Sequence, residues 1–201
     1  ARELWMKLLE ARAETGEPYL INIDTCNEAL PQSQKDLGLK INQSNLCSEI
    51  TLATNEERTA VCCLSSVNLE YFDKWKKNEQ FIDDLITMLD NVLEHFIEAI
   101  VDTSGLGGYS ANFKRFKNYV KEEKEGLVKA AYSAYRERSL GLGAMGFHAY
   151  LQSKTLPFNG LQSTSINNNI FSHIKTKATE STQRLCQERG EAPDVHGSNN
   201  R

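Results

Sequence analysis

A long amphipathic segment over residues 79–100 constrains the fold more than any other part of the sequence. Its apolar side chains recur at intervals of three and four residues and are Phe81, Ile82, Leu85, Ile86, Leu89, Val92, Leu93, Phe96 and Ile97. Such a stripe predicts a helix with one buried face. This is the clearest helix in the sequence.

Three further helices are predicted from the same periodicity, over residues 2–13, 130–139 and 165–189. Gly16 is placed to end the first helix, and Gly190 with Pro193 to end the last. Two segments, 19–23 and 60–69, are instead apolar without glycine or proline, which predicts short buried strands. Long helices with a few short strands indicate a helix-rich α/β fold.

Three glycines, Gly141, Gly143 and Gly146, match the G-x-G-x-x-G spacing of dinucleotide-binding folds. That fingerprint follows a strand and precedes an acidic residue by about twenty positions. Here a helical pattern precedes the glycines, and residues 166–169 are isoleucine and three asparagines. We therefore expect a helix whose glycines let another backbone pack closely.

Composition excludes several classes of protein. The 201 residues and the formal net charge of -4 suit one domain or a slice of a larger one, and argue against a protein dedicated to DNA, RNA or a membrane surface. No apolar run reaches the roughly twenty residues that cross a bilayer. Five unevenly spaced cysteines are unlike a secreted disulfide framework and indicate a reducing, cytoplasmic location.

The stretch Ser-Asn-Leu-Cys-Ser-Glu-Ile at residues 44–50 carries the strongest chemical signal. In an extended backbone, Asn45, Cys47 and Glu49 project to the same side. A buried amide and carboxylate need hydrogen-bond partners, and the hydroxyl groups of a substrate would supply them. The alternative is three solvated residues near a turn, with the cysteine acting as a small apolar group.

The segment at 60–69 favours the functional interpretation, because it could bring a second thiol close to Cys47. It contains the adjacent cysteines Cys62 and Cys63. Side chains alternate along a strand, so at most one of these two can face a shared site. Alternation alone does not choose between them.

These two segments resemble the centre of the large, catalytic subunit of class I ribonucleotide reductases. The similarity rests on Asn-Leu-Cys-Ser-Glu-Ile at 45–50 and Val-Cys-Cys-Leu-Ser-Ser-Val-Asn-Leu at 61–69, with further matches at 15–19 and 136–147 in the family's order. The resemblance implies that residues 1–201 are a fragment of a ten-stranded α/β barrel. A finger loop would lie at about residues 42–52, and residues 101–127 would be an insertion.

The resemblance also implies roles for four residues. Cys47 would become a thiyl radical that removes the hydrogen at C3′ of the ribose, and Glu49 would accept the proton of the 3′-hydroxyl. Asn45 would bind the ribose hydroxyls together with Glu49. Cys62 would be one of two redox-active cysteines that end as a disulfide. No metal ligand is expected in the chain.

Several partners are implied that the sequence does not contain. A metal-containing small subunit would supply the radical, and thioredoxin or glutaredoxin would be the reductant. ATP and deoxynucleotide effectors would bind parts of the large subunit that have no match here. Because the chain looks cut at both ends, we expect it to need the remaining segments of the large subunit and to be inactive alone.

Four alternatives stay open. The chain could be the inert product of a truncated or split gene, or a fragment of a cobalamin-dependent (class II) reductase. A cysteine hydrolase would need a histidine to activate Cys47, and none of the four histidines has a supporting motif. A structural zinc site would need spacing such as C-x-x-C, which the adjacent Cys62 and Cys63 do not provide.

Overall fold

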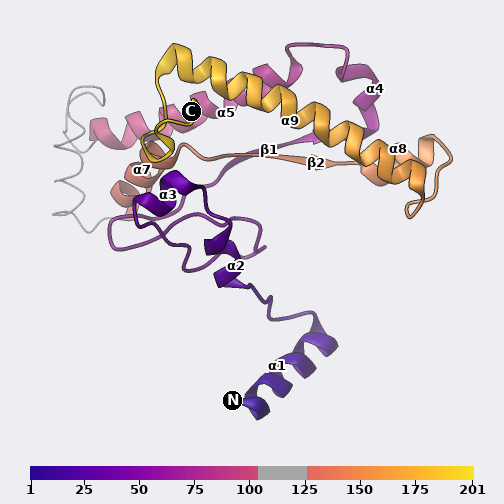
Figure 1. Ribbon diagram of the computed structural model, residues 1–201, viewed down its shortest axis with the longest axis horizontal. Helices are drawn as coiled ribbons and strands as arrows, with labels where there is room; N and C mark the ends of the chain where they lie inside the picture. The colour runs from indigo at the N-terminus through magenta and orange to yellow at the C-terminus, as the bar shows by residue number, and fades with distance from the viewer. Residues whose placement is uncertain (104–125) are drawn as a thin grey trace.

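Two parallel strands run through the middle of the body of the protein, in a computed structural model that describes residues 1–103 and 126–201 (Figure 1). The strands are β1 (Cys63–Asn68) and β2 (Leu140–Met145), and they pair Cys63 with Leu140 and Asn68 with Met145. The strand predicted at 60–69 is therefore confirmed as β1. The insertion predicted at about 101–127 lies almost wholly outside the described residues.

The helix predicted around Gly141 and Gly143 is wrong, because this segment is strand β2. Its glycines do allow a close backbone approach. A Cβ added at Gly141 would lie 3.1 Å from Leu64 Cβ, and one at Gly143 would lie 2.9 Å from Ser66 Oγ. Pairing with β1 over the length of the strand outweighs the local pattern, which is a common way for tertiary context to override propensity.

Helices account for most of the remaining chain. They are α1 (Arg2–Thr15), α2 (Ile23–Glu28), α3 (Gln32–Asp36), α4 (Phe72–Trp75), α5 (Phe81–Thr103), α7 (Gly126–Glu137), α8 (Phe147–Ser153) and α9 (Leu161–Arg189), with short 3-10 helices η1 (Leu69–Tyr71) and η3 (Pro193–Val195). The four predicted helices are confirmed as α1, α5, α7 and α9. Helix α3 is not among the predicted helices.

Helix α5 contributes to both clusters of the hydrophobic core, and its predicted apolar face is the buried one. It packs against α9, against α7 and against both strands. Its buried apolar side chains are Ile82, Ile86, Leu89, Leu93, Ile97 and Val101. One cluster of buried residues joins α5 to α4, α8, α9 and β1, and a second joins α5 to α7.

The N-terminal part of the chain stands away from this core. Helix α1 projects from the body in Figure 1 and has no buried residue. The strand predicted at 19–23 is wrong, since Tyr19, Leu20 and Ile21 are 52%, 44% and 38% exposed and α2 begins at Ile23. A strand needs a hydrogen-bonding neighbour, and no strand in the described residues lies beside this segment.

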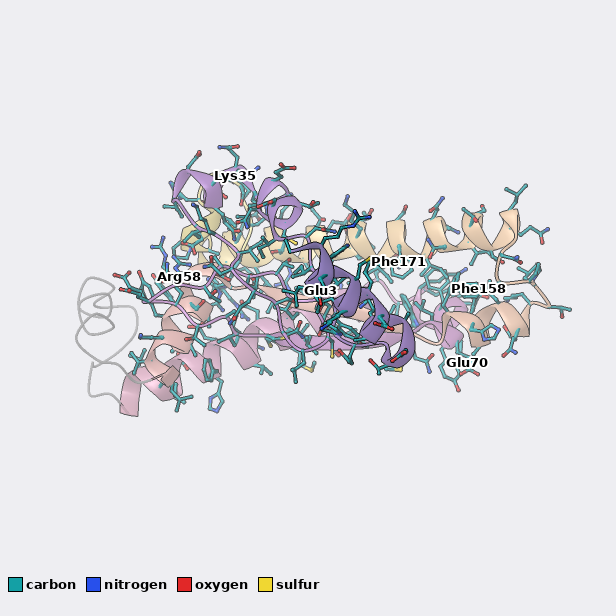
Figure 2. All side chains as sticks on the ribbon, turned by 90° about the horizontal axis from the view of Figure 1, so that it is seen from below. Glu3, Lys35, Arg58, Glu70, Phe158 and Phe171 are labelled. Carbon is teal, nitrogen blue, oxygen red and sulfur yellow. The ribbon has the colours of Figure 1, made fainter. Side chains whose placement is uncertain are left out.

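Arg58 lies near one end of the molecule, close to α7, and Phe158 lies near the opposite end, in the connection between α8 and α9 (Figure 2).

In the parts of the chain that the structure describes, no helix is both long enough and apolar enough to cross a membrane.

Candidate functional site

The finger loop (residues 42–52) ends in a tight turn rather than an extended strand. Ser48 N donates a hydrogen bond to Asn45 O at 3.1 Å, and Ser48 adopts a φ of 65°. Asn45 Oδ1 also accepts from Ile50 N at 3.1 Å. The extended backbone expected for residues 45–50 is therefore wrong, because an asparagine side chain can satisfy nearby backbone groups and stabilise a turn.

The turn brings two of the predicted site residues into contact. Asn45 Nδ2 donates to Glu49 Oε1 at 2.6 Å. The second carboxylate oxygen of Glu49 has no hydrogen-bond partner among the described residues, and both side chains are exposed. A hydroxyl group approaching the loop can therefore bind Glu49 next to an amide.

Cys47 lies at the tip of the same turn and is exposed as a free thiol. Its neighbour Leu46 is 96% exposed, so the tip projects from the described residues.

Glu49 and Cys62 line the same cavity, which has a volume of about 230 Å³. The other lining residues are Ile50, Thr51, Leu52, Val61, Cys63, Ser139, Leu140 and Gly141. The cavity thus joins the second half of the finger loop to the beginning of β1 and of β2. Cys47 does not line it, so the described residues bring Glu49, but not Cys47, to Cys62.

The two adjacent cysteines differ in their surroundings. Cys63 is half-buried, and its Sγ donates to Leu89 O of α5 at 3.4 Å. Cys62 is exposed toward the cavity, where partial burial, and then the charge of Glu49, raise the pKa of its thiol. Both cysteines line the cavity, but the thiol of Cys63 is engaged by a helix carbonyl, whereas Cys62 lies near the carboxylate of Glu49.

Two buried ion clusters anchor the end of α7, just before the cavity residue Ser139. Arg58 binds Asp194 and lies 3.3 Å from Glu137 Oε1. Arg138, which has a φ of 45°, binds Asp90 of α5. Buried charges persist where they are paired and hydrogen-bonded, so these clusters fix the backbone from which β2 begins.

Sequence reasoning missed Ser139 to Gly141 as part of the cavity, although one signal pointed toward them. Asp90 interrupts the apolar stripe of α5 between Ile86 and Leu93 and is 1% exposed. A carboxylate on a buried helix face predicts a buried cationic partner. Arg138 is that partner, and Ser139 follows it directly.

A metal centre finds no support in the described residues. Within residues 1–103 and 126–201, no three side chains of His, Cys, Asp or Glu are grouped closely enough to hold a metal ion.

Comparisons with known proteins identify the family to which the chain belongs. The family model of the ribonucleotide reductase barrel domain matches residues 1–201. The ribonucleoside-diphosphate reductase large subunit of Invertebrate iridescent virus 3 is 48% identical over 201 residues, which are 100% of this chain and 28% of the relative. The corresponding large subunit of Invertebrate iridescent virus 6 is 39% identical over 155 residues, covering 77% of this chain and 14% of that protein.

A solved structure gives the same answer for the fold. The class Id ribonucleotide reductase alpha subunit of Actinobacillus ureae superposes with a TM-score of 0.81 and 36% sequence identity, over 100% of this chain and 34% of that chain. The expected fold class, part of the α/β barrel of these reductases, is thereby confirmed. The chain spans less than a third of the length of the iridescent virus 3 relative. It belongs to the ribonucleotide reductase family and corresponds to barrel-domain sequence of the large, catalytic subunit.

Proposed function

We propose that the chain carries the radical-bearing loop of a ribonucleotide reductase large subunit, which reduces ribonucleotides to deoxyribonucleotides. The observation that carries the proposal is the 2.6 Å contact between Asn45 Nδ2 and Glu49 Oε1 on either side of Cys47. Glu49 also shares a cavity with Cys62. The chain therefore holds an amide, a carboxylate and two of the three thiols that this chemistry requires.

The chemistry begins at the loop tip. A thiyl radical on Cys47 takes the hydrogen atom from C3′ of the ribose, so the S–H bond forms as the C3′–H bond breaks. Glu49 accepts the proton of the 3′-hydroxyl, which a general base within hydrogen-bond reach can do. Asn45 orients the ribose hydroxyls, because its amide offers both a donor and an acceptor.

Reduction then needs two electrons and two protons. The 2′-hydroxyl leaves as water, and Cys62 with a second redox cysteine outside this chain supplies both electrons and both protons as their sulfurs join in a disulfide. Cys47 finally returns the hydrogen atom to C3′ and becomes a thiyl radical again. The raised pKa of Cys62 suits this role, since the group must act as a protonated thiol.

The remaining components lie outside the described residues. A metal-containing small subunit supplies the radical to Cys47. Thioredoxin or glutaredoxin reduces the disulfide, and ATP or deoxynucleotide effectors bind other parts of the large subunit. All five cysteines are free, as a reducing cytoplasm would keep them. Because the chain spans 28% of the length of the iridescent virus 3 relative, it has no turnover without the rest of the subunit.

A chimeric large subunit tests the proposal directly. The segment of the iridescent virus 3 protein that matches residues 1–201 is replaced by this chain, and the chimera is combined with that virus's small subunit. We expect it to form deoxynucleotide from a ribonucleoside diphosphate. Cys47→Ser abolishes product formation, because the O–H bond is stronger than the S–H bond, whereas Cys186→Ser in α9 leaves activity in place.

Two outcomes would contradict the proposal. A chimera that binds the small subunit normally but forms no product would identify the chain as an inert gene product. Product formation by the isolated 201-residue chain would contradict the need for the remaining segments.

A further inference from the structure

One side-chain amide from α2 fixes the base of the finger loop. Asn27 Nδ2 donates to Ile41 O at 2.8 Å, and Asn27 Oδ1 accepts from Ile41 N at 2.9 Å. The amide therefore satisfies both backbone groups of Ile41, as a neighbouring β-strand would do.

Ile41 is the residue from which the finger loop departs. Its side chain is 3% exposed, so this point of the chain is buried. The loop returns beside it, where Thr54 N donates to Lys40 O at 3.3 Å and Asn42 Nδ2 donates to Thr54 O at 2.7 Å. Hydrogen bonds thus join the outgoing and returning segments of the loop to each other, and Asn27 joins them to α2.

Further hydrogen bonds carry this anchorage toward the tip. Ser44 Oγ donates to Ile50 O at 2.7 Å, and Ile50 N donates to Asn45 Oδ1 at 3.1 Å. These successive hydrogen bonds between the outgoing and returning segments of the loop make it move as a unit. A shift at Ile41 therefore reaches Asn45, Cys47 and Glu49.

The local role of Asn27 does not explain these contacts. Its Nδ2 also donates to Ile23 O at 2.9 Å, four residues earlier in α2. That bond would serve the helix by itself. The two bonds to Ile41 span fourteen positions and serve only the finger loop.

We propose that Asn27 is a positioning residue, which sets the location of Asn45, Cys47 and Glu49 by holding the backbone at Ile41. Asn27 does not touch the reacting groups and acts through the loop. The catalytic consequence rests on the proposed function, whereas the anchorage of the loop does not.

Hydrogen–deuterium exchange on the 201-residue chain tests the anchorage. In Asn27→Ala, both backbone groups of Ile41 lose their partner, and we expect exchange in a peptide covering residues 40–54 to rise about tenfold. Exchange in α5 and α9 stays unchanged. Asn27→Asp keeps an acceptor for Ile41 N but loses the donor for Ile41 O. Its exchange rate at 40–54 therefore lies between those of the parent and of Asn27→Ala.

Asn169→Ala is the matched control, because it removes the same side chain from an exposed position of α9. It leaves exchange at 40–54 unaltered. Unchanged exchange at 40–54 in Asn27→Ala, or an equal rise in α5, would overturn the anchorage.

The chimeric reductase tests the catalytic consequence. A loop displaced by a fraction of an ångström misaligns the reacting atoms, so Asn27→Ala lowers kcat by about tenfold or more while KM for the nucleotide changes less. Asn27→Asp recovers part of the loss, and Asn169→Ala behaves as the parent. Faster exchange at 40–54 in Asn27→Ala together with an unchanged kcat would refute the positioning role. An inactive parent chimera would instead contradict the proposed function and leave the exchange result to decide the anchorage.

Discussion

Arg138 and Asp90 form a buried ion pair that joins the end of α7 to the middle of α5, with Nη2 of Arg138 2.6 Å from Oδ1 of Asp90. Asp90 also accepts from Arg189 at 2.6 Å and from Arg201 at 3.2 Å. Glu94 belongs to the same cluster, because it forms ion pairs with Arg138 and Arg201. Three guanidinium groups thus share two carboxylates, and Asp90 is the one that contacts all three.

Asp90→Ala therefore removes the centre of the cluster. The variant leaves Arg138 buried with Glu94 as its remaining carboxylate partner in the cluster, and we expect a loss of about 3–5 kcal/mol in the free energy of unfolding. Urea denaturation of the parent and the variant measures the difference. Glu98→Ala, at an exposed position of the same helix, is the control and changes stability by less than about 0.5 kcal/mol. Equal effects of the two substitutions would show that the cluster does not stabilise the fold.

Gly146 links β2 to α8 in a conformation that favours glycine. Its φ is 79°, and an added Cβ would clash with Asn68 Oδ1 and lie 3.3 Å from Glu70 N. We expect Gly146→Ala to lower the free energy of unfolding by about 2 kcal/mol. The matched control is Gly126→Ala at the start of α7, where a Cβ meets nothing within 4 Å and stability is unchanged or slightly higher. An unchanged free energy of unfolding in Gly146→Ala would contradict this account of the β2–α8 connection.

Glu137 makes stability fall as the pH rises. Burial, with the nearby charge of Asp194 adding to it, raises the pKa of Glu137 to about 7 despite Arg58. The folded protein therefore holds a proton that the unfolded chain releases above a pKa of about 4.3. The stabilising effect of this proton is complete below the unfolded pKa and is lost as the pH rises toward 7, by on the order of 3 kcal/mol.

Glu137→Gln isolates this effect, because glutamine has a similar shape and does not titrate. Denaturation curves between pH 4 and pH 8 should show a smaller decline in stability for the variant than for the parent. Parallel curves for the two proteins over that interval would mean that Glu137 titrates normally.

Glu49 influences the reactivity of Cys62 across their shared cavity. Its charge adds to the effect of burial in raising the pKa of the thiol. Glu49→Gln should therefore lower the pKa of Cys62 and move the onset of its alkylation to lower pH. Mass spectrometry that follows each cysteine separately measures the profile. Glu56→Gln, in the exposed turn before β1, should leave the profile of Cys62 unaltered, and an identical effect of both substitutions would count against the contact.

The sequence by itself determined the four longest helices and the family. Helices α5 and α9 follow from their apolar spacing, and the ends of α1 and α9 follow from Gly16 and Gly190, because a helix makes its backbone hydrogen bonds within a few residues. The family followed from short motifs around Cys47 and Cys62. The roles assigned to Asn45, Cys47, Glu49 and Cys62 stay predictions.

Only the tertiary structure decided strand β2, the conformation of residues 19–23 and the finger loop. Residues 140–145 are a strand because Cys63 lies opposite Leu140, and residues 19–23 are not a strand because no described strand lies beside them. The finger loop depends on an amide at Asn27, which meets Ile41 from another element. Strands and loops receive their hydrogen bonds from residues distant in the chain, and local sequence patterns do not record which distant residues will be there.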